Sequence, residues 1–185
     1  MSEQAGSALE DRVGDLDRFC ERAEGAGAAV HRPADDQALA ALLAELAGDG
    51  AVVTPLGDRA DSLDGLLPAA PLTTRIDGGS SVTDVADAPV GIVAAAAAVS
   101  ETGSVLLVER EAYEMWVSLL ARRLVVIVDR STILTDLDAL APVLTERTAA
   151  GWCTLVTGPS RTADIERVLT IGVQGPAELD VVVRP

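Results

Sequence analysis

The segment AAVHRPADDQALAALLAELAGDGAVVT, residues 28–54, decides the fold. Its short apolar run at residues 28–31 predicts a strand, residues 34–47 have the length and the alanine and leucine content of a helix, and residues 51–54 predict a second strand. Two glycines between the helix and the second strand are a common signal that ends a helix. Strand, helix and strand in this order indicate a parallel sheet with helical crossovers.

The rest of the chain repeats this alternation. Two helical patterns, residues 111–122 and 137–149, lie among apolar runs that have the length of buried strands. These runs are residues 90–93, 104–108, 124–128, 153–157 and 179–183. Residues 55–89 are richer in glycine, proline and aspartate, which predicts a short helix at residues 62–67, loops and an edge strand. The alanine run after residue 93 indicates close packing.

The N-terminal segment precedes this pattern. Apolar residues at three- and four-residue steps over residues 7–26 predict an amphipathic helix ahead of the first strand. The chain has 185 residues, of which 49% are hydrophobic, so it can bury one sizeable core. We therefore expect two parts, an N-terminal helical arm of residues 1–27 and a single α/β domain of residues 28–185.

The charge of the chain excludes several classes of partner and of chemistry. The formal net charge is −15, which disfavours nucleic acids and anionic membrane surfaces because both require a basic surface. All 14 basic residues are arginines. The absence of lysine from the sequence excludes a Schiff-base lysine and a phosphate-loop lysine.

The two cysteines, Cys20 and Cys153, stand far apart and neither belongs to a CxxC motif. We therefore expect no zinc site, no iron–sulfur cluster and no other cofactor in this chain. The N-terminus lacks the basic start and the apolar run of a secretory signal, and the longest apolar stretch, residues 91–99, is too short to span a bilayer. A cytoplasmic location with no membrane insertion is the expectation.

Three glycine-containing segments follow or precede predicted strands in the C-terminal half. They are SETGS at residues 100–104, TGPSRTADIE at residues 157–166 and GVQGP at residues 172–176. Ligands of open α/β sheets bind outside the carboxyl ends of the strands, so the second segment is placed where a ligand is expected.

Together these segments resemble the lactate-utilisation (LUD) domain, and the chain is most similar to the short members of that family called lactate utilisation protein C. The resemblance covers residues 90–183, where VGI, SETGS, SLL, a hydrophobic strand, TGPSRTADIE, GVQGP and a final strand follow one another in the order that the family has. The order of several motifs makes the resemblance specific. The N-terminal half matches in predicted architecture only.

The resemblance implies a Rossmann-like α/β fold, a three-layer sandwich with a mainly parallel sheet similar to that of sugar-phosphate isomerases and CoA transferases. It also implies a non-redox role in oxidising L-lactate to pyruvate, with iron–sulfur clusters held by partner proteins, and it is compatible with a homo-oligomer. Two positions depart from the family, which usually has histidine where this chain has Leu124 and Gln174. Proton transfer by either histidine cannot occur in the same way here.

The segment TGPSRTADIE is the first candidate site. We expect it to follow a strand and open a helix, so that Gly158 makes a tight turn, Ser160 caps the helix, and free backbone N–H groups with Arg161 hold a carboxylate or phosphate. The alternative is an ordinary capped connection with Arg161 in solvent.

Glu101 is the candidate catalytic residue, and Thr102 and Gly103 beside it are candidate ligand-binding residues. A glutamate between apolar runs can be partly desolvated and aimed into a cleft. The segment VSETGSVLL also resembles the glutamate loop of class I CoA transferases, in which the glutamate is the nucleophile. The alternative is a glutamate that caps a turn or pairs with an arginine.

Gln174 and Gly175 complete the candidate ligand site, because the Gln174 amide can bind a ligand oxygen while the glycine shapes the turn. His31, the only histidine, is too isolated in the sequence to suggest a metal site or a dyad. Three functions stay open: a non-redox component of a lactate utilisation system that binds a small anion, an acyl or CoA transferase using Glu101, and a regulatory ligand-binding protein.

Overall fold

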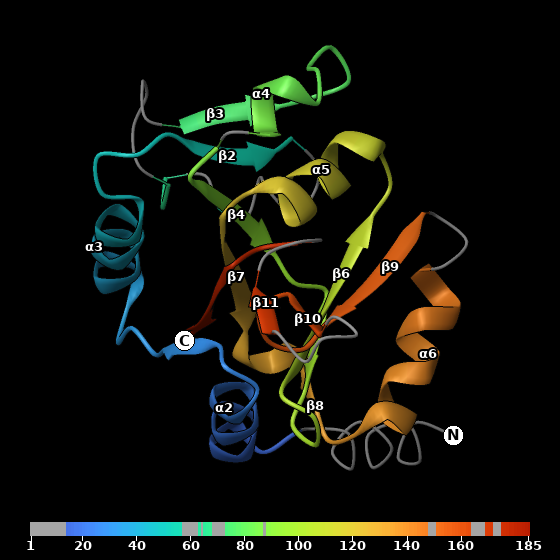
Figure 1. The fold of residues 1–185 in the computed structure, drawn as a ribbon. Helices are drawn as coiled ribbons and strands as arrows, with labels where there is room; N and C mark the ends of the chain where they lie inside the picture. The colour runs from blue at the N-terminus through green and yellow to red at the C-terminus, as the bar shows by residue number, and fades with distance from the viewer. Residues whose placement is uncertain are drawn as a thin grey trace.

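The fold is built on a six-stranded parallel sheet with the strand order β1-β12-β7-β4-β2-β3 (Figure 1). The computed structural model describes residues 14–56, 63, 65–67, 73–86, 88–147, 151–163, 169–171 and 175–185. The strands of this sheet are β1 (Ala29–His31), β2 (Val52–Pro55), β3 (Thr73–Ile76), β4 (Val90–Ala94), β7 (Arg123–Asp129) and β12 (Glu178–Arg184). The structure confirms the predicted strand–helix–strand unit at residues 28–54. It also confirms the predicted edge strand, which is β3.

A second, four-stranded sheet has the order β8-β5-β6-β9. It contains β5 (Ala97–Val99), β6 (Ser104–Glu109), β8 (Ile133–Leu134) and β9 (Trp152–Val156). Strand β6 runs antiparallel to both β5 and β9. The predicted strands at residues 104–108 and 153–157 therefore exist, but they belong to this sheet and not to the parallel one. The alanine run, for which no strand is predicted, supplies β5.

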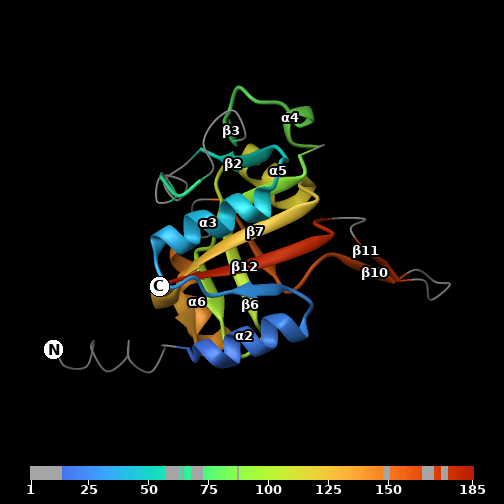
Figure 2. The same ribbon diagram turned by 90° about the vertical axis from the view of Figure 1, so that its left-hand side faces the viewer.

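Helices cover both sheets (Figures 1 and 2). Helix α3 (Asp36–Ala47) packs Leu39 and Leu43 against one face of the parallel sheet. The other face is covered by α2 (Leu16–Gly25), by α5 (Ala112–Leu120) and by the inner side of the second sheet. Helix α6 (Leu137–Arg147) packs against the outer side of the second sheet, and α4 (Thr83–Ala86) is one short turn. The α/β sandwich with a mainly parallel sheet is confirmed.

The N-terminal helix is an integral layer of this sandwich. Phe19 and Ala23 of α2 are fully buried and belong to the same core cluster as the parallel sheet. Burial raises the pKa of the Cys20 thiol on the same helix face. The helix predicted at residues 7–26 begins at Leu16, after Asp15 in an extended conformation, and the part of the prediction before residue 14 lies outside the described residues.

The helix predicted at residues 62–67 is wrong for residues 65–67, which form a turn and a bend. Leu63 lies in a short 3-10 turn, and the Leu66 N–H donates to the Leu63 carbonyl at 3.0 Å. Residues 62 and 64 lie outside the described residues.

The prediction that a helix begins within TGPSRTADIE, near Ser160, is wrong. Residues Arg161–Ala163 form strand β10, which pairs antiparallel with β11 (Leu169–Ile171). The two strands form a hairpin that projects from the body of the molecule (Figure 2). Cross-strand pairing with the β-branched residues of β11 overrides the local preference for a capped helix, because it satisfies the same backbone groups.

None of the helices in the described part of the chain combines the length and the hydropathy that a membrane span requires.

Candidate functional site

Two of the three motif segments are joined by a chain of hydroxyl groups. Ser104 begins β6 and Thr157 follows β9, and the antiparallel pairing of these strands brings both ends together. The Ser104 Oγ lies 2.6 Å from the Thr157 Oγ1 and 2.7 Å from the Thr102 Oγ1. Ser104 is buried, Thr102 is half-buried and Thr157 is exposed. The chain of hydroxyls therefore runs from the interior to the surface.

The third segment joins the second through the backbone. The Ser160 N–H donates to the Pro176 carbonyl at 2.9 Å. A Cβ added at Gly175 would lie only 3.3 Å from the Ser160 Cβ, so the two segments are in close contact. The three motif segments thus form one group, which we call the motif cluster: residues 100–104, 157–160 and 175–176.

Helix α2 lies directly on this motif cluster. Gly103 has a φ of +70°, and a Cβ at this residue would lie 2.2 Å from the backbone nitrogen of Ala23. Gly158 has a φ of +76°, and its Cβ would lie 2.3 Å from the carbonyl oxygen of Ala26. Only glycine permits both the positive φ and the close approach. These two glycines are therefore explained by the packing of α2.

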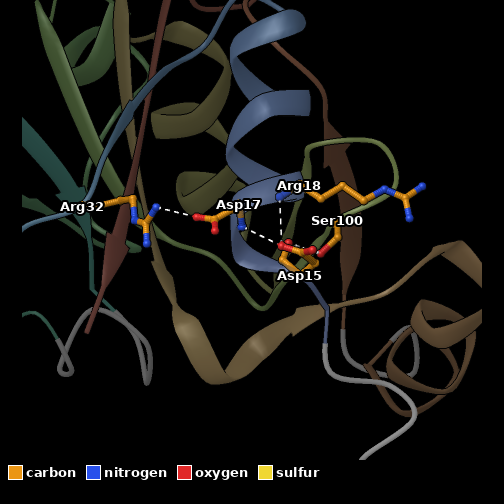
Figure 3. A network of polar contacts seen from close by, with 5 residues as sticks. All are labelled: Asp15, Asp17, Arg18, Arg32 and Ser100. Atoms are coloured by element: carbon orange, nitrogen blue, oxygen red, sulfur yellow. Dashed lines mark hydrogen bonds and ion pairs between the residues drawn. The ribbon is translucent and has the colours of Figure 1, made fainter.

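The start of α2 is fixed to the same loop (Figure 3). The Ser100 Oγ donates to the carbonyl oxygen of Asp15 at 2.8 Å. The Asp15 carboxylate caps the helix by accepting from the Asp17 and Arg18 N–H groups at 2.9 and 3.1 Å. Asp17 also forms an ion pair with Arg32. The first motif segment therefore contacts α2 near both of its ends, through Ser100 at Asp15 and through Gly103 at Ala23. The sequence pattern of the motifs does not indicate this role.

Glu101 lies in the turn between β5 and β6. Its N–H donates to the Thr135 carbonyl at 3.1 Å, and the following turn is closed by the bond from the Gly103 N–H to the Val99 carbonyl at 2.9 Å. Its side chain is exposed, so the partial desolvation expected from the sequence is wrong. The turn presents the Glu101 carboxylate to solvent on a fixed backbone.

The anion site expected near Ser160 depended on a helix that begins there, and the structure has a strand at that position. Ser160 caps no helix, because β10 begins at the next residue, and its N–H is used by Pro176. Arg161 lies on β10, but its side chain is outside the described part of the structure. Gln174 lies outside the described residues. Apart from the Glu101 carboxylate, the polar side-chain groups of the described motif cluster are hydroxyls. Two contacts among Thr102, Ser104 and Thr157 use two of their three protons, which leaves one for a ligand.

Three further observations extend to residues outside the motif cluster. Leu124, where the family usually has histidine, is fully buried in the core on β7. His31 is not isolated in space, because its Nε2 lies 2.8 Å from the Asp180 Oδ1. Among the described residues, no three histidine, cysteine, aspartate or glutamate side chains gather to hold a metal ion.

Comparison with known proteins places this arrangement in a family. The model of the LUD domain matches residues 16–183, which include α2 and all three motif segments. The chain belongs to the LUD domain family. A solved structure of a DUF162 family protein from Deinococcus radiodurans has the same fold, with a TM-score of 0.71 and 24% identity over 92% of this chain and 96% of that one.

Curated relatives of this LUD-domain protein match part of its length. The protein YkgG of Escherichia coli K12 is 33% identical over 106 residues, which are 55% of this chain and 46% of YkgG. Lactate utilization protein C of Shouchella clausii is 31% identical over 113 residues, 59% of this chain and 49% of that protein. The corresponding protein of Bacillus subtilis is 30% identical over 106 residues, 55% and 44% of the two chains. The matched segments span less than half of each relative.

Proposed function

We propose that this protein is a non-redox component of an L-lactate utilisation system and that its motif cluster binds a small carboxylate such as lactate. Membership of the LUD domain family and the similarity to proteins named lactate utilization protein C support the metabolic role. Oxidation of lactate to pyruvate releases two electrons. Partner proteins with iron–sulfur clusters would accept them, as the family resemblance implies, while this chain binds and orients the anion.

The observation that carries the proposal is the hydroxyl chain Thr102, Ser104 and Thr157. Neutral hydroxyl donors suit a small hydroxy acid, because they can donate to its carboxylate and accept from its hydroxyl group. Hydrogen bonds to a charged group are also stronger than those between neutral groups. Since Thr157 is exposed, a ligand can reach this end of the chain from solvent.

We expect L-lactate to stabilise the wild-type protein and Ser104→Ala to weaken its binding roughly tenfold, because the variant interrupts the hydroxyl chain. Binding is measured by isothermal titration calorimetry and by the shift in Tm with increasing lactate. Ser131→Ala removes an exposed hydroxyl outside the motif cluster and should bind lactate like the wild type. Equal affinities of the Ser104 variant and the wild type, or no stabilisation by lactate, would contradict the proposal.

The second candidate is an acyl or CoA transferase, which the exposure of Glu101 on a fixed turn favours. In such a reaction the Glu101 carboxylate attacks the thioester carbonyl of an acyl-CoA and displaces the CoA thiolate, which forms a glutamyl anhydride. The thiolate then attacks the glutamyl carbonyl, which gives a glutamyl-CoA thioester and releases the acyl group as a carboxylate.

If this second candidate holds, wild-type protein incubated with acyl-CoA and then hydroxylamine gains the mass of a hydroxamate on the peptide that contains Glu101. Glu101→Gln should abolish that adduct, because the amide is a far weaker nucleophile than the carboxylate. Glu21→Gln, which changes an exposed carboxylate on α2, should leave it unchanged. An absence of adduct with any donor would remove the transferase from consideration.

A further inference from the structure

Strand β9 is the outermost strand of the second sheet. It pairs with β6 on one side, and no other described strand pairs with its outer side. An edge strand presents a row of backbone N–H and C=O groups that can extend the sheet with a strand from another chain. Proteins usually prevent such pairing by placing charges, proline or a bulge on the edge.

The sequence of β9, WCTLV, contains none of these protective features. It has no charge and no proline, and its regular register with β6 runs without a bulge from Val156 to Trp152. Its exposed side chains are large and apolar: Trp152 is 51% exposed and Leu155 is 43% exposed. These two side chains point to opposite faces, because an odd number of steps separates them along the strand. Both faces of the edge thus offer apolar surface.

We propose that β9 pairs antiparallel with β9 of a second copy of this chain, across a twofold axis at Thr154, so that the two four-stranded sheets become one. An antiparallel pair of identical strands is self-complementary, and only a register centred on the middle residue pairs all five positions. The proposal is independent of the proposed function, because it concerns the outer edge of β9 and not the hydroxyl chain of Thr102, Ser104 and Thr157.

This register places apolar residues opposite one another on both sides of the central threonine. Trp152 lies opposite Val156 of the second copy, Cys153 lies opposite Leu155 of the second copy, and Thr154 lies opposite itself. Each large side chain therefore faces a smaller one, which fits the space between directly opposed residues. Threonine pairs are also favourable across strands.

Charge and packing also favour a second copy as the occupant. The net charge of −15 opposes self-association wherever acidic residues meet, but β9 contributes no charge to the contact. The inner ladder is already fixed, because the Thr154 Oγ1 donates to the buried Glu109 carboxylate on β6 at 3.0 Å. The strand is thus presented in the conformation that the pairing needs.

The oligomeric state of the full chain tests the proposal. Size-exclusion chromatography with light scattering at micromolar concentrations should give a dimer. Leu155→Arg should raise the dimer dissociation constant roughly 100-fold or more, because it places a charge inside the contact. Leu137→Arg is the matched control, since Leu137 is 45% exposed on α6 and lies outside β9, and it should remain dimeric. Far-UV circular dichroism establishes that both variants fold.

A monomeric wild type would overturn the proposal, and so would a dimer that Leu155→Arg leaves as tight as before. Cross-linking tests the register without a disruptive change. Leu155→Cys places a thiol opposite Cys153 of the second copy, so mild oxidation should give a disulfide-linked dimer. Leu155→Cys combined with Cys153→Ser should lose that cross-link, because the two remaining thiols are no longer opposite one another. Retention of the cross-link in the double variant would overturn the register centred on Thr154.

Discussion

Replacement of Gly103 by alanine is expected to lower the free energy of unfolding by about 3 kcal/mol. The φ of +70° alone disfavours any residue with a Cβ. The added methyl group would also lie 2.2 Å from the backbone nitrogen of Ala23, so α2 must move away from the motif cluster. That movement would partly expose Phe19 and Ala23, which are now fully buried. Urea denaturation followed by circular dichroism measures the loss.

Gly25→Ala is the matched control for this prediction. Gly25 lies in α2, two residues after Ala23, and a Cβ there would meet no atom within 4 Å apart from its chain neighbours and the backbone of its own helix. Because alanine is a better helix former than glycine, the control should be neutral or slightly more stable than the wild type. If Gly103→Ala proves as stable as Gly25→Ala, α2 does not rest on the first motif segment as described.

The parallel sheet could be predicted because its strands carry strong local signals. The runs that became β4, β7 and β12 are rich in valine and isoleucine and are bounded by turn residues. Periodicity indicates that a strand exists, but it does not assign the strand to a sheet or give its direction. For this reason β6 and β9 could be predicted as strands, while their membership of a separate antiparallel sheet could not.

The helix expected after Ser160 shows the limit of local chemistry. A serine followed by polar and acidic residues is typical of a helix start, yet residues 161–163 pair with residues 169–171. The candidate site was also only partly predictable from local sequence. The motifs could be predicted to lie in loops, but the contact between Ser104 and Thr157 spans 53 positions and depends on the register of β6 with β9. Such contacts are tertiary and leave no trace in either segment alone.

The pair of His31 and Asp180 is the clearest such contact, and it joins residues 149 positions apart. Strands β1 and β12 are parallel neighbours, with Ala29 opposite Asp180, so the His31 side chain reaches back along the sheet. The Asp180 Oδ1 lies 2.8 Å from the His31 Nε2, and the Asp180 Oδ2 lies 3.2 Å from the Arg123 Nε. The Asp180 side chain is only 4% exposed. One buried carboxylate therefore links three strands of the sheet.

Asp180→Ala is accordingly expected to cost about 3 kcal/mol of stability, because it leaves Arg123 and His31 beside a buried cavity without their common partner. The loss is measured by urea denaturation. Glu178→Ala is the matched control: the Glu178 carboxylate contacts the same Arg123 at 2.6 Å but is 48% exposed. An exposed pair contributes little, so this variant should lose about 0.5 kcal/mol or less. Similar losses for the two variants would show that burial of Asp180 does not govern the energy of this cluster. A double-mutant cycle of His31→Ala with Asp180→Ala then isolates the pair, and a coupling energy near zero would assign the effect of Asp180 to Arg123 alone.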